Sequence, residues 1–194
     1  DKIKLSDEQK NAVRGIVGHH VSILTGGAGV GKSSAAKKII EVLNSLGKNI
    51  VLCAPTGKAA KRIVEITNCE ASTIHRLLGF DPVNGGFMKN ENNPIEADVI
   101  LVDETSMVDI NLMASLLRAV SYDTQIIFVG DQNQLFPISA GCFFKDIIDS
   151  GAVPVFELNT IFRQGKDSLI IKYAHEINNN IVPNIDSPLL NPKI

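Results

Sequence analysis

Eight consecutive residues near the start of the chain have the composition and spacing of a phosphate-binding loop. Residues 26–33 read Gly-Gly-Ala-Gly-Val-Gly-Lys-Ser and fit the pattern G-x-x-x-x-G-K-[ST], between an apolar run and a helix-like segment. Glycines permit the backbone conformations that turn several N–H groups toward a phosphate, and the following helix presents its positive end to it. Lys32 can reach the β- and γ-phosphates and Ser33 can bind Mg²⁺, unless the segment is only a glycine-rich turn with an exposed lysine. The residues expected to hold the nucleotide are Gly27, Ala28, Gly29, Val30, Gly31, Lys32, Ser33 and Ser34.

Two adjacent carboxylates follow a second apolar run. Residues 99–102 read Val-Ile-Leu-Val and precede Asp103 and Glu104. Asp103 is suited to hold Mg²⁺ through its water shell, and Glu104 is suited to orient and deprotonate an attacking water. An acidic junction between a strand and a loop is common by itself, but beside a phosphate-binding loop it indicates a catalytic pair. Kinases with such a loop usually lack this glutamate, so the pair favours hydrolysis of ATP over transfer of its phosphate.

The segments that must position these residues alternate between strands and helices. Strands are predicted at residues 21–25, 50–54, 98–103, 125–130 and 155–158, and helices at residues 31–46, 57–67, 110–120 and 140–149. The strands are continuous apolar runs, which is typical of parallel strands that are buried on both faces. The sequence therefore predicts an α/β fold, with a mainly parallel sheet flanked by helices on both faces. In such a sheet, ligands bind at the carboxyl ends of the strands, where the phosphate loop and the carboxylate pair both lie.

Composition sets further limits. The 194 residues are 44% hydrophobic, enough for one core, and the net charge of −2 excludes a general polycation but allows a local basic groove. The three cysteines, Cys53, Cys69 and Cys142, form no Cys-x-x-Cys pair, so we expect no disulfide framework or zinc site and a reducing, cytoplasmic setting. No apolar run is long enough to cross a bilayer, so no membrane partner is expected. The glycine- and asparagine-rich residues 81–93 predict an exposed loop or small hairpin.

Five further segments resemble the motifs of superfamily 1 helicases. They are residues 54–60 (Ala-Pro-Thr-Gly-Lys-Ala-Ala, motif Ia), 73–78 (Thr-Ile-His-Arg-Leu-Leu, motif Ib), 103–109 (Asp-Glu-Thr-Ser-Met-Val-Asp, motif II), 130–135 (Gly-Asp-Gln-Asn-Gln-Leu, motif III) and 161–164 (Ile-Phe-Arg-Gln, motif IV). In this order the chain closely resembles the RecD-like helicases, the family of the exodeoxyribonuclease V alpha subunit. The resemblance implies a RecA-like ATPase domain at residues 1–165, followed by a helix and a linker at residues 166–194. Motifs V and VI have no counterpart here, which implies that a second RecA-like domain lies outside this chain.

The resemblance also implies roles for single residues around the nucleotide. Gln9 matches the glutamine that recognises adenine, although Ser6 and Gln9 also have the spacing of a helix capping box. Gln134 matches a sensor of the γ-phosphate that is linked to the DNA site, and Asp131 either orients it or is a turn residue. Arg163 matches an arginine that stabilises the charge that develops on the γ-phosphate, with a surface salt bridge as the alternative. Lys32, Glu104, Gln134 and Arg163 are therefore the expected catalytic residues.

The residues that the resemblance places on a track for single-stranded DNA lie in motifs Ia and Ib. They are Pro55, Thr56, Gly57, Lys58, Thr73 and His75. The strand-end position of the first four suits a phosphate contact, whereas His75 is as readily a structural residue. Lys61 and Arg62 either extend this basic patch or are solvated surface. Aromatic residues are scarce and tryptophan is absent, which favours contact with the DNA backbone over a base-stacking platform.

The function that the resemblance implies is translocation along single-stranded DNA, driven by Mg-ATP, in the 5′ to 3′ direction. Its expected partners are single-stranded DNA, junctions of single- and double-stranded DNA, the second motor domain and subunits of a nuclease complex in recombination and repair. The isolated chain is expected to bind nucleotide weakly and not to unwind DNA. Two alternatives remain: a protein-remodelling or transport ATPase, and a structural subunit without activity. The intact Lys32, Ser33, Asp103 and Glu104 argue against the second alternative.

Overall fold

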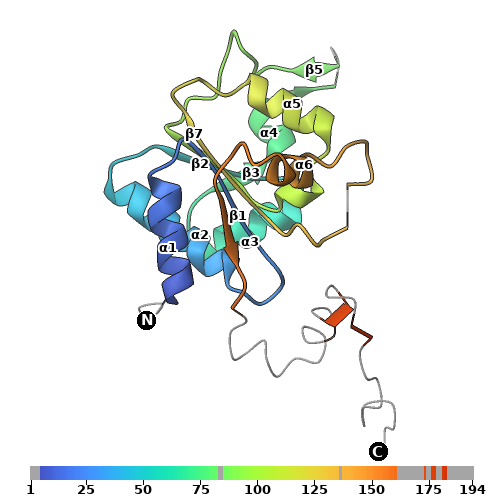
Figure 1. The fold of residues 1–194 in the computed structure, drawn as a ribbon. Coiled ribbons are helices and arrows are strands. Elements are labelled where there is room, and N and C mark those ends of the chain that lie inside the picture. The colour runs from blue at the N-terminus through green and yellow to red at the C-terminus, as the bar shows by residue number, and fades with distance from the viewer. Residues whose placement is uncertain are drawn as a thin grey trace, which may run out of the picture.

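Six parallel strands form the central sheet of the computed structural model, which describes residues 5–82, 85–135, 137–160 and five positions beyond them (173, 176, 177, 181 and 182) (Figure 1). The strands are β1 (Val21–Gly26), β2 (Ile50–Ala54), β3 (Ala71–Thr73), β6 (Val99–Val102), β7 (Gln125–Gly130) and β8 (Val155–Leu158). Their order in the sheet is β3-β2-β6-β7-β1-β8, and every neighbouring pair is parallel. The predicted parallel sheet is therefore confirmed.

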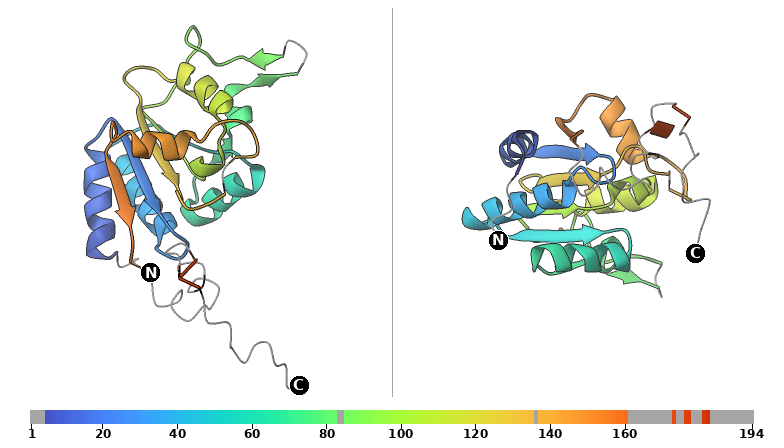
Figure 2. Two further views of the ribbon diagram at one scale, coloured as in Figure 1. Left: turned by 45° about the vertical axis from the view of Figure 1, so that its right-hand side comes forward. Right: turned by 90° about the horizontal axis from the view of Figure 1, so that it is seen from below.

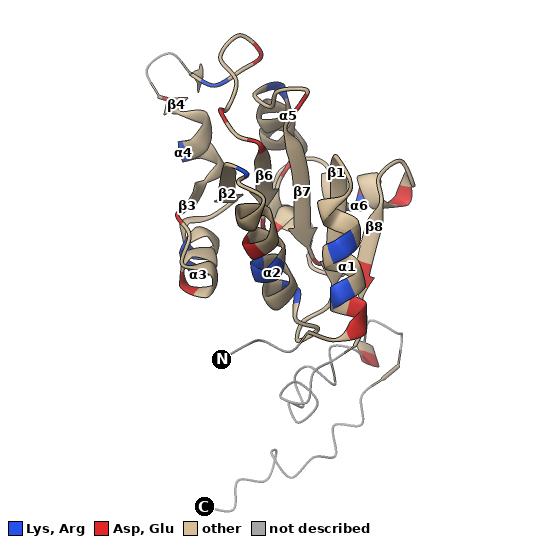
Figure 3. Cartoon of the chain, turned by 90° about the vertical axis from the view of Figure 1, so that its left-hand side faces the viewer, with Lys and Arg blue, Asp and Glu red and all other residues tan. Residues whose placement is uncertain are grey.

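Helices cover both faces of this sheet. They are α1 (Asp7–Val17), α2 (Lys32–Ser45), α3 (Gly57–Thr67), α4 (Ile74–Leu78), α5 (Ile110–Arg118) and α6 (Phe143–Asp149). Successive residues of one strand point to opposite faces, so Leu24 of β1 packs with α1, α2 and α3, while Ile23 packs with α4, α5 and α6. Figure 3 looks onto the first of these faces, with α1 and α2 in front of the strands. None of the described helices combines the length and the apolar character that crossing a bilayer requires.

Element boundaries agree with the predictions to within three residues. The helix predicted at residues 110–120 ends at Arg118, and the helix predicted at residues 31–46 spans Lys32–Ser45. The helix predicted at residues 140–149 begins only at Phe143, because Gly141 has a φ of 92°, which an α-helix does not accommodate. The strand predicted at residues 98–103 is one residue shorter at each end. The small hairpin predicted within residues 81–93 is confirmed as β4 (Phe80–Asp81) and β5 (Gly86–Phe87), which project away from the sheet (Figure 2).

Four elements were not predicted as such, and one of them is the single-turn 3₁₀ helix η1 (Thr105–Met107) that follows the carboxylate pair. Helix α1 begins after Ser6, whose hydroxyl accepts from the backbone N–H of Gln9. Strand β3 has three residues and no apolar run, and the helix α4 that follows has five residues. Such short elements are held by the neighbours they pack against rather than by their own propensity.

The candidate functional residues lie at one edge of the sheet. Because the strands are parallel, the residues that follow β1, β2, β6 and β7 all emerge at the carboxyl ends of the strands. These residues are the phosphate loop, the segment from Pro55, the Asp103–Glu104 pair and the segment from Asp131. The boundary predicted between residues 165 and 166 lies outside the described residues, so the division into two parts stays a prediction.

Candidate nucleotide and nucleic-acid site

The phosphate loop connects the end of β1 to the start of α2. Gly31 has a φ of 83° and a ψ of 30°, a left-handed conformation that favours glycine, and it is the N-cap residue of α2. No side chain caps this helix, so the backbone N–H groups of its first turn, which contains Ser33 and Ser34, have no side-chain acceptor. Free N–H groups and the positive end of a helix are the features that bind a phosphate. The local structure therefore fits the predicted nucleotide loop.

Lys32 lies folded over its own loop. Its Nζ donates to the carbonyl oxygens of Gly26 and Gly27, the latter at 2.9 Å. Burial lowers the pKa of Lys32 below its ordinary value of 10.5, while the negative charge of Asp131, and less strongly of the Asp103–Glu104 pair, acts in the opposite direction. A lysine that is partly removed from water and satisfied only by carbonyl oxygens gains by exchanging them for anionic phosphate oxygens.

Asp103 ends β6 in a shielded position beside a second carboxylate. Burial, and then the negative charge of Glu104, raise the pKa of Asp103 from 3.8 to about 6. The backbone N–H of Asp103 donates to the carbonyl of Cys53 at 2.9 Å, which anchors this position to β2. Asp103 has no ion-pair partner among the residues that the structure describes. Asp103 follows β6, which is separated from β1 by β7 alone. A shielded carboxylate without an ion-pair partner suits a hard divalent cation such as Mg²⁺.

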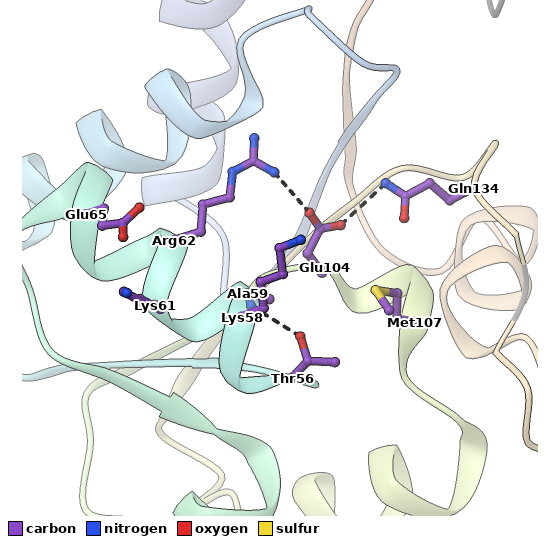
Figure 4. A pocket seen from close by; sticks show the side chains of 9 residues that line it. All are labelled: Thr56, Lys58, Ala59, Lys61, Arg62, Glu65, Glu104, Met107 and Gln134. Atoms are coloured by element: carbon purple, nitrogen blue, oxygen red, sulfur yellow. Dashed lines mark hydrogen bonds and ion pairs between the residues drawn. The ribbon is translucent and has the colours of Figure 1, made fainter.

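Glu104 occupies an uncommon backbone conformation. Its φ of 51° and ψ of 39° place it in the left-handed region, which costs a residue with a side chain on the order of 1–3 kcal/mol. Its carboxylate is held from two sides: Gln134 Nε2 donates to Oε2 at 3.4 Å, and Arg62 Nη1 lies 3.7 Å from Oε1 (Figure 4). Strain of this kind is typical of functional positions that the surrounding structure holds in place.

Gln134 links the carboxylate pair to the turn after β7. Its Oε1 accepts from the hydroxyl of Ser106 at 3.3 Å, and its backbone N–H donates to the carbonyl of Asp131 at 3.1 Å. Asp131 is buried, and its carboxylate accepts from the backbone N–H of Asn133 at 2.9 Å. Asp131 is thus a turn residue in this structure, while a role of its side chain in orienting Gln134 stays a prediction.

Gln9 joins helix α1 to the phosphate loop. Ser6 N–H donates to Gln9 Oε1 at 3.0 Å, and Gln9 N–H donates to Ser6 Oγ at 3.2 Å, so the capping box is confirmed. Gln9 Nε2 also donates to the carbonyl of Gly31 at 3.2 Å, and the residue is buried. The glutamine is therefore placed at the loop that would hold the nucleotide, while its adenine contact stays a prediction.

The predicted DNA contacts fall into two groups. Thr56 and Thr73 are the N-cap residues of α3 and α4, and both lie at the carboxyl ends of neighbouring strands, since Thr73 pairs with Ala54 of β2. Gly57 and Lys58 are exposed in the first turn of α3, directly after the N-cap Thr56, which follows Pro55. His75 instead packs against the hairpin, with ring centroids 6.1 Å from Phe80 and 5.8 Å from Phe87. His75 thus has a structural contact, as its alternative interpretation predicts.

A pocket of about 560 Å³ lies between α3 and the carboxylate pair. Its lining residues are Thr56, Lys58, Ala59, Lys61, Arg62, Glu65, Glu104, Met107 and Gln134 (Figure 4). The pocket therefore contains two predicted DNA contacts, Thr56 and Lys58, together with two predicted catalytic residues, Glu104 and Gln134. Lys32, Ser33 and Asp103 do not line it.

Sequence reasoning missed two partners of these residues, and one of its predictions lies outside the described part of the chain. Arg62 was expected either in a basic patch or on solvated surface, and Ser106 was given no role. No local pattern could have found either contact, because each joins segments far apart in the sequence. Arg163 lies outside the described residues, so its role stays a prediction.

Comparison with known proteins agrees with this geometry. The family model described as an AAA domain matches residues 9–140. The chain is 43% identical over 171 residues to the ATP-dependent RecD2 DNA helicase of Deinococcus radiodurans, covering 88% of this chain and 23% of that protein. It is 36% identical over 185 residues to the RecBCD enzyme subunit RecD of Mycolicibacterium smegmatis, covering 82% of this chain and 33% of that protein.

A solved structure shows the same fold. The Pif1 helicase from Candida albicans superposes with a TM-score of 0.71 and 26% sequence identity, covering 94% of this chain and 45% of that chain. The chain thus spans about a quarter to a third of the two curated relatives and less than half of the Pif1 chain. It belongs to the RecD-like family of superfamily 1 DNA helicases, of which it contains the first, RecA-like motor domain.

Proposed function

We propose that this chain binds and hydrolyses Mg-ATP as one half of a DNA helicase motor. The observation that carries the proposal is the position of Glu104, which is strained, shielded and held by Gln134 at the same sheet edge as the phosphate loop. A glutamate placed there can accept a proton from a water molecule that attacks the γ-phosphate. Many ATPases share the phosphate-binding loop, but the combination of this loop with Glu104 and Gln134 matches the motifs of the RecD-like helicases.

The residues around the nucleotide divide the chemistry among them. Lys32 exchanges the carbonyls of Gly26 and Gly27 for phosphate oxygens, and the free N–H groups of the α2 N-terminus surround them. Bound Mg²⁺ would neutralise charge on the phosphates, with Ser33 and Asp103 as its protein-side contacts. Glu104 takes one proton from the attacking water as the oxygen–phosphorus bond forms and the bond to ADP breaks.

Single-stranded DNA is the proposed track. Thr56 and Thr73 cap helices α3 and α4, which follow the neighbouring strands β2 and β3, and Lys58 adds a positive charge near Thr56. Helix N-termini and lysines bind phosphates without reading base sequence, so we expect contact that is independent of sequence and weakened by salt. In the whole protein, a second motor domain and Arg163 would complete the nucleotide cleft, and movement would run 5′ to 3′. Association with subunits of a nuclease complex, as the name of the mycobacterial relative suggests, is part of the same proposal.

The test is the effect of single-stranded DNA on ATP turnover by the full-length protein. We expect oligo-dT to stimulate hydrolysis, and we expect Lys32→Ala to remove turnover with and without DNA because the phosphates lose their main positive partner. The isolated 194-residue chain should not separate strands. Turnover that ignores DNA in the full-length protein would instead favour a protein-remodelling or transport ATPase.

Gln9→Ala should weaken ATP binding beyond its effect on stability. The substitution removes one bond of the capping box and the bond to Gly31, so we expect a loss of about 1–2 kcal/mol in the free energy of unfolding. Ser6→Ala is the matched control, because it removes the cap and leaves the Gln9–Gly31 bond. Nucleotide affinity, measured by titration with ATP and GTP, should fall and lose its preference for ATP only in Gln9→Ala. Equal losses of affinity in both variants would assign the effect to helix α1 alone.

A further inference from the structure

The pocket beside α3 brings cations of the proposed DNA site against the proposed catalytic base. Three cations line it, Lys58, Lys61 and Arg62, and two carboxylates face them, Glu65 and Glu104. Figure 4 shows Arg62 pointing from α3 toward Glu104, with Gln134 on the other side of that carboxylate. The space is large enough for an anion and is positively charged on balance.

The ion pair between Arg62 and Glu104 is weak enough for another anion to replace Glu104. A single nitrogen–oxygen distance of 3.7 Å joins the two groups, and the side chains are 61% and 21% exposed. An ion pair that is this open and is not bidentate stabilises by about 0–1 kcal/mol. A competing anion therefore needs little free energy to displace it.

While the contact persists, both oxygens of Glu104 are engaged. Oε1 faces the guanidinium of Arg62, and Oε2 accepts from Gln134. An oxygen turned toward a guanidinium is less available to accept the proton of a water molecule. The described arrangement therefore suits a resting state of the base better than a working one.

A nucleic-acid phosphate is a stronger partner for Arg62 than Glu104 is. A guanidinium binds phosphate through two parallel hydrogen bonds, and Lys58 and Lys61 add charge at the same wall of the pocket. Helix α3 also starts at Thr56, where the proposed track lies, so Arg62 is less than two turns from it. Arg62 and Glu104 line the same pocket as Thr56 and Lys58, so a phosphate bound there lies within reach of the guanidinium.

We infer that Arg62 is a positioning residue that restrains Glu104 until a phosphate of single-stranded DNA draws it away. This inference rests on the proposed function, and it assigns to the α3 pocket the coupling between DNA binding and ATP hydrolysis. Gln134 keeps its bond to Glu104 and directs the freed carboxylate. The chain thus restrains hydrolysis in the absence of a track.

The experiment measures ATP turnover of the full-length protein at saturating ATP, with and without oligo-dT. In Arg62→Gln we expect DNA-free turnover to rise by about two- to fivefold, the equivalent of an ion pair worth up to about 1 kcal/mol. The DNA-stimulated rate should change little, so the stimulation ratio falls by the same factor. The KM for ATP should not change, because Arg62 is not part of the phosphate loop. Arg62→Lys should restore part of the stimulation ratio.

Arg118→Gln is the matched control, since it makes the same substitution on an exposed helical position of α5 away from the pocket. The inference is overturned if Arg62→Gln lowers DNA-free turnover, raises both rates equally or behaves like Arg118→Gln. A wild-type protein without DNA stimulation would overturn the proposed function and this inference together. A wild-type protein with stimulation, and an unchanged ratio in Arg62→Gln, would overturn the inference alone.

Discussion

Replacing Glu104 with glutamine should lower the DNA-stimulated ATP turnover of the full-length protein by about 100- to 10,000-fold, the usual contribution of a positioned general base. Glutamine has nearly the same shape and keeps an oxygen that can accept from Gln134, but it cannot take a proton from water. Nucleotide binding should persist, because Lys32 and the α2 N-terminus are unchanged. Steady-state turnover and titration with a fluorescent ATP analogue measure the two effects separately.

The control for this prediction is Glu70→Gln. Glu70 is exposed and directly precedes β3, so it lies toward the amino ends of the strands, opposite the site. The same chemical change there should leave turnover close to that of the wild type. If Glu104→Gln kept more than about a tenth of wild-type turnover, which is an increase of under about 1.4 kcal/mol in the activation barrier, Glu104 would not be the base.

Replacing Asp103 with asparagine should have opposite effects on activity and stability. Hydrolysis should fall with the loss of the Mg²⁺ contact, whereas the nucleotide-free chain should become more stable at pH 8 by about 1–3 kcal/mol. The reason is that burial and Glu104 raise the pKa of Asp103 to about 6 in the folded chain, against 3.8 in the unfolded chain. The folded state therefore binds the proton more tightly, and stability decreases as pH rises from about 4 through 6.

Urea unfolding without Mg²⁺ or nucleotide measures this effect. The stability difference between Asp103→Asn and wild type should be small near pH 4, reach about half of its size at pH 5 and be complete at pH 8, since asparagine has no charge to shield. Asp123→Asn is the control, because Asp123 is exposed in the turn before β7. A gain of the same size at pH 4 and pH 8, or no gain at pH 8, would contradict the raised pKa of Asp103.

Local patterns were sufficient for the elements that contain the catalytic groups. The phosphate loop, the capping box at Ser6 and the strand before Asp103 each depend on residues within a few positions of one another, so their spacing is visible in the sequence. Strand β3 was missed because three residues without an apolar run contain no such pattern. The start of α6 was predicted too early because the sequence shows a glycine at position 141 but not its φ.

The order of the strands in the sheet, unlike the elements themselves, does not follow from local patterns. Continuous apolar runs predict parallel strands, but they do not say that β6 lies between β2 and β7 or that β1 separates β7 from β8. Which strands become neighbours depends on which helix faces pack together. The rule that crossover connections are right-handed still allows several strand orders. The sequence left this order open, and packing in the structure shows it.

By itself the sequence determined the groups that do the chemistry: a phosphate loop, Asp103 and Glu104, since their types and spacing are local. Only the tertiary structure decided what those groups touch. Gln9 reaches Gly31, and Arg62 and Gln134 meet at Glu104, through contacts between segments far apart in the chain. The physical reason is that parallel strands gather their carboxyl ends at one edge, whereas the side chains that meet there depend on how each helix packs on the sheet.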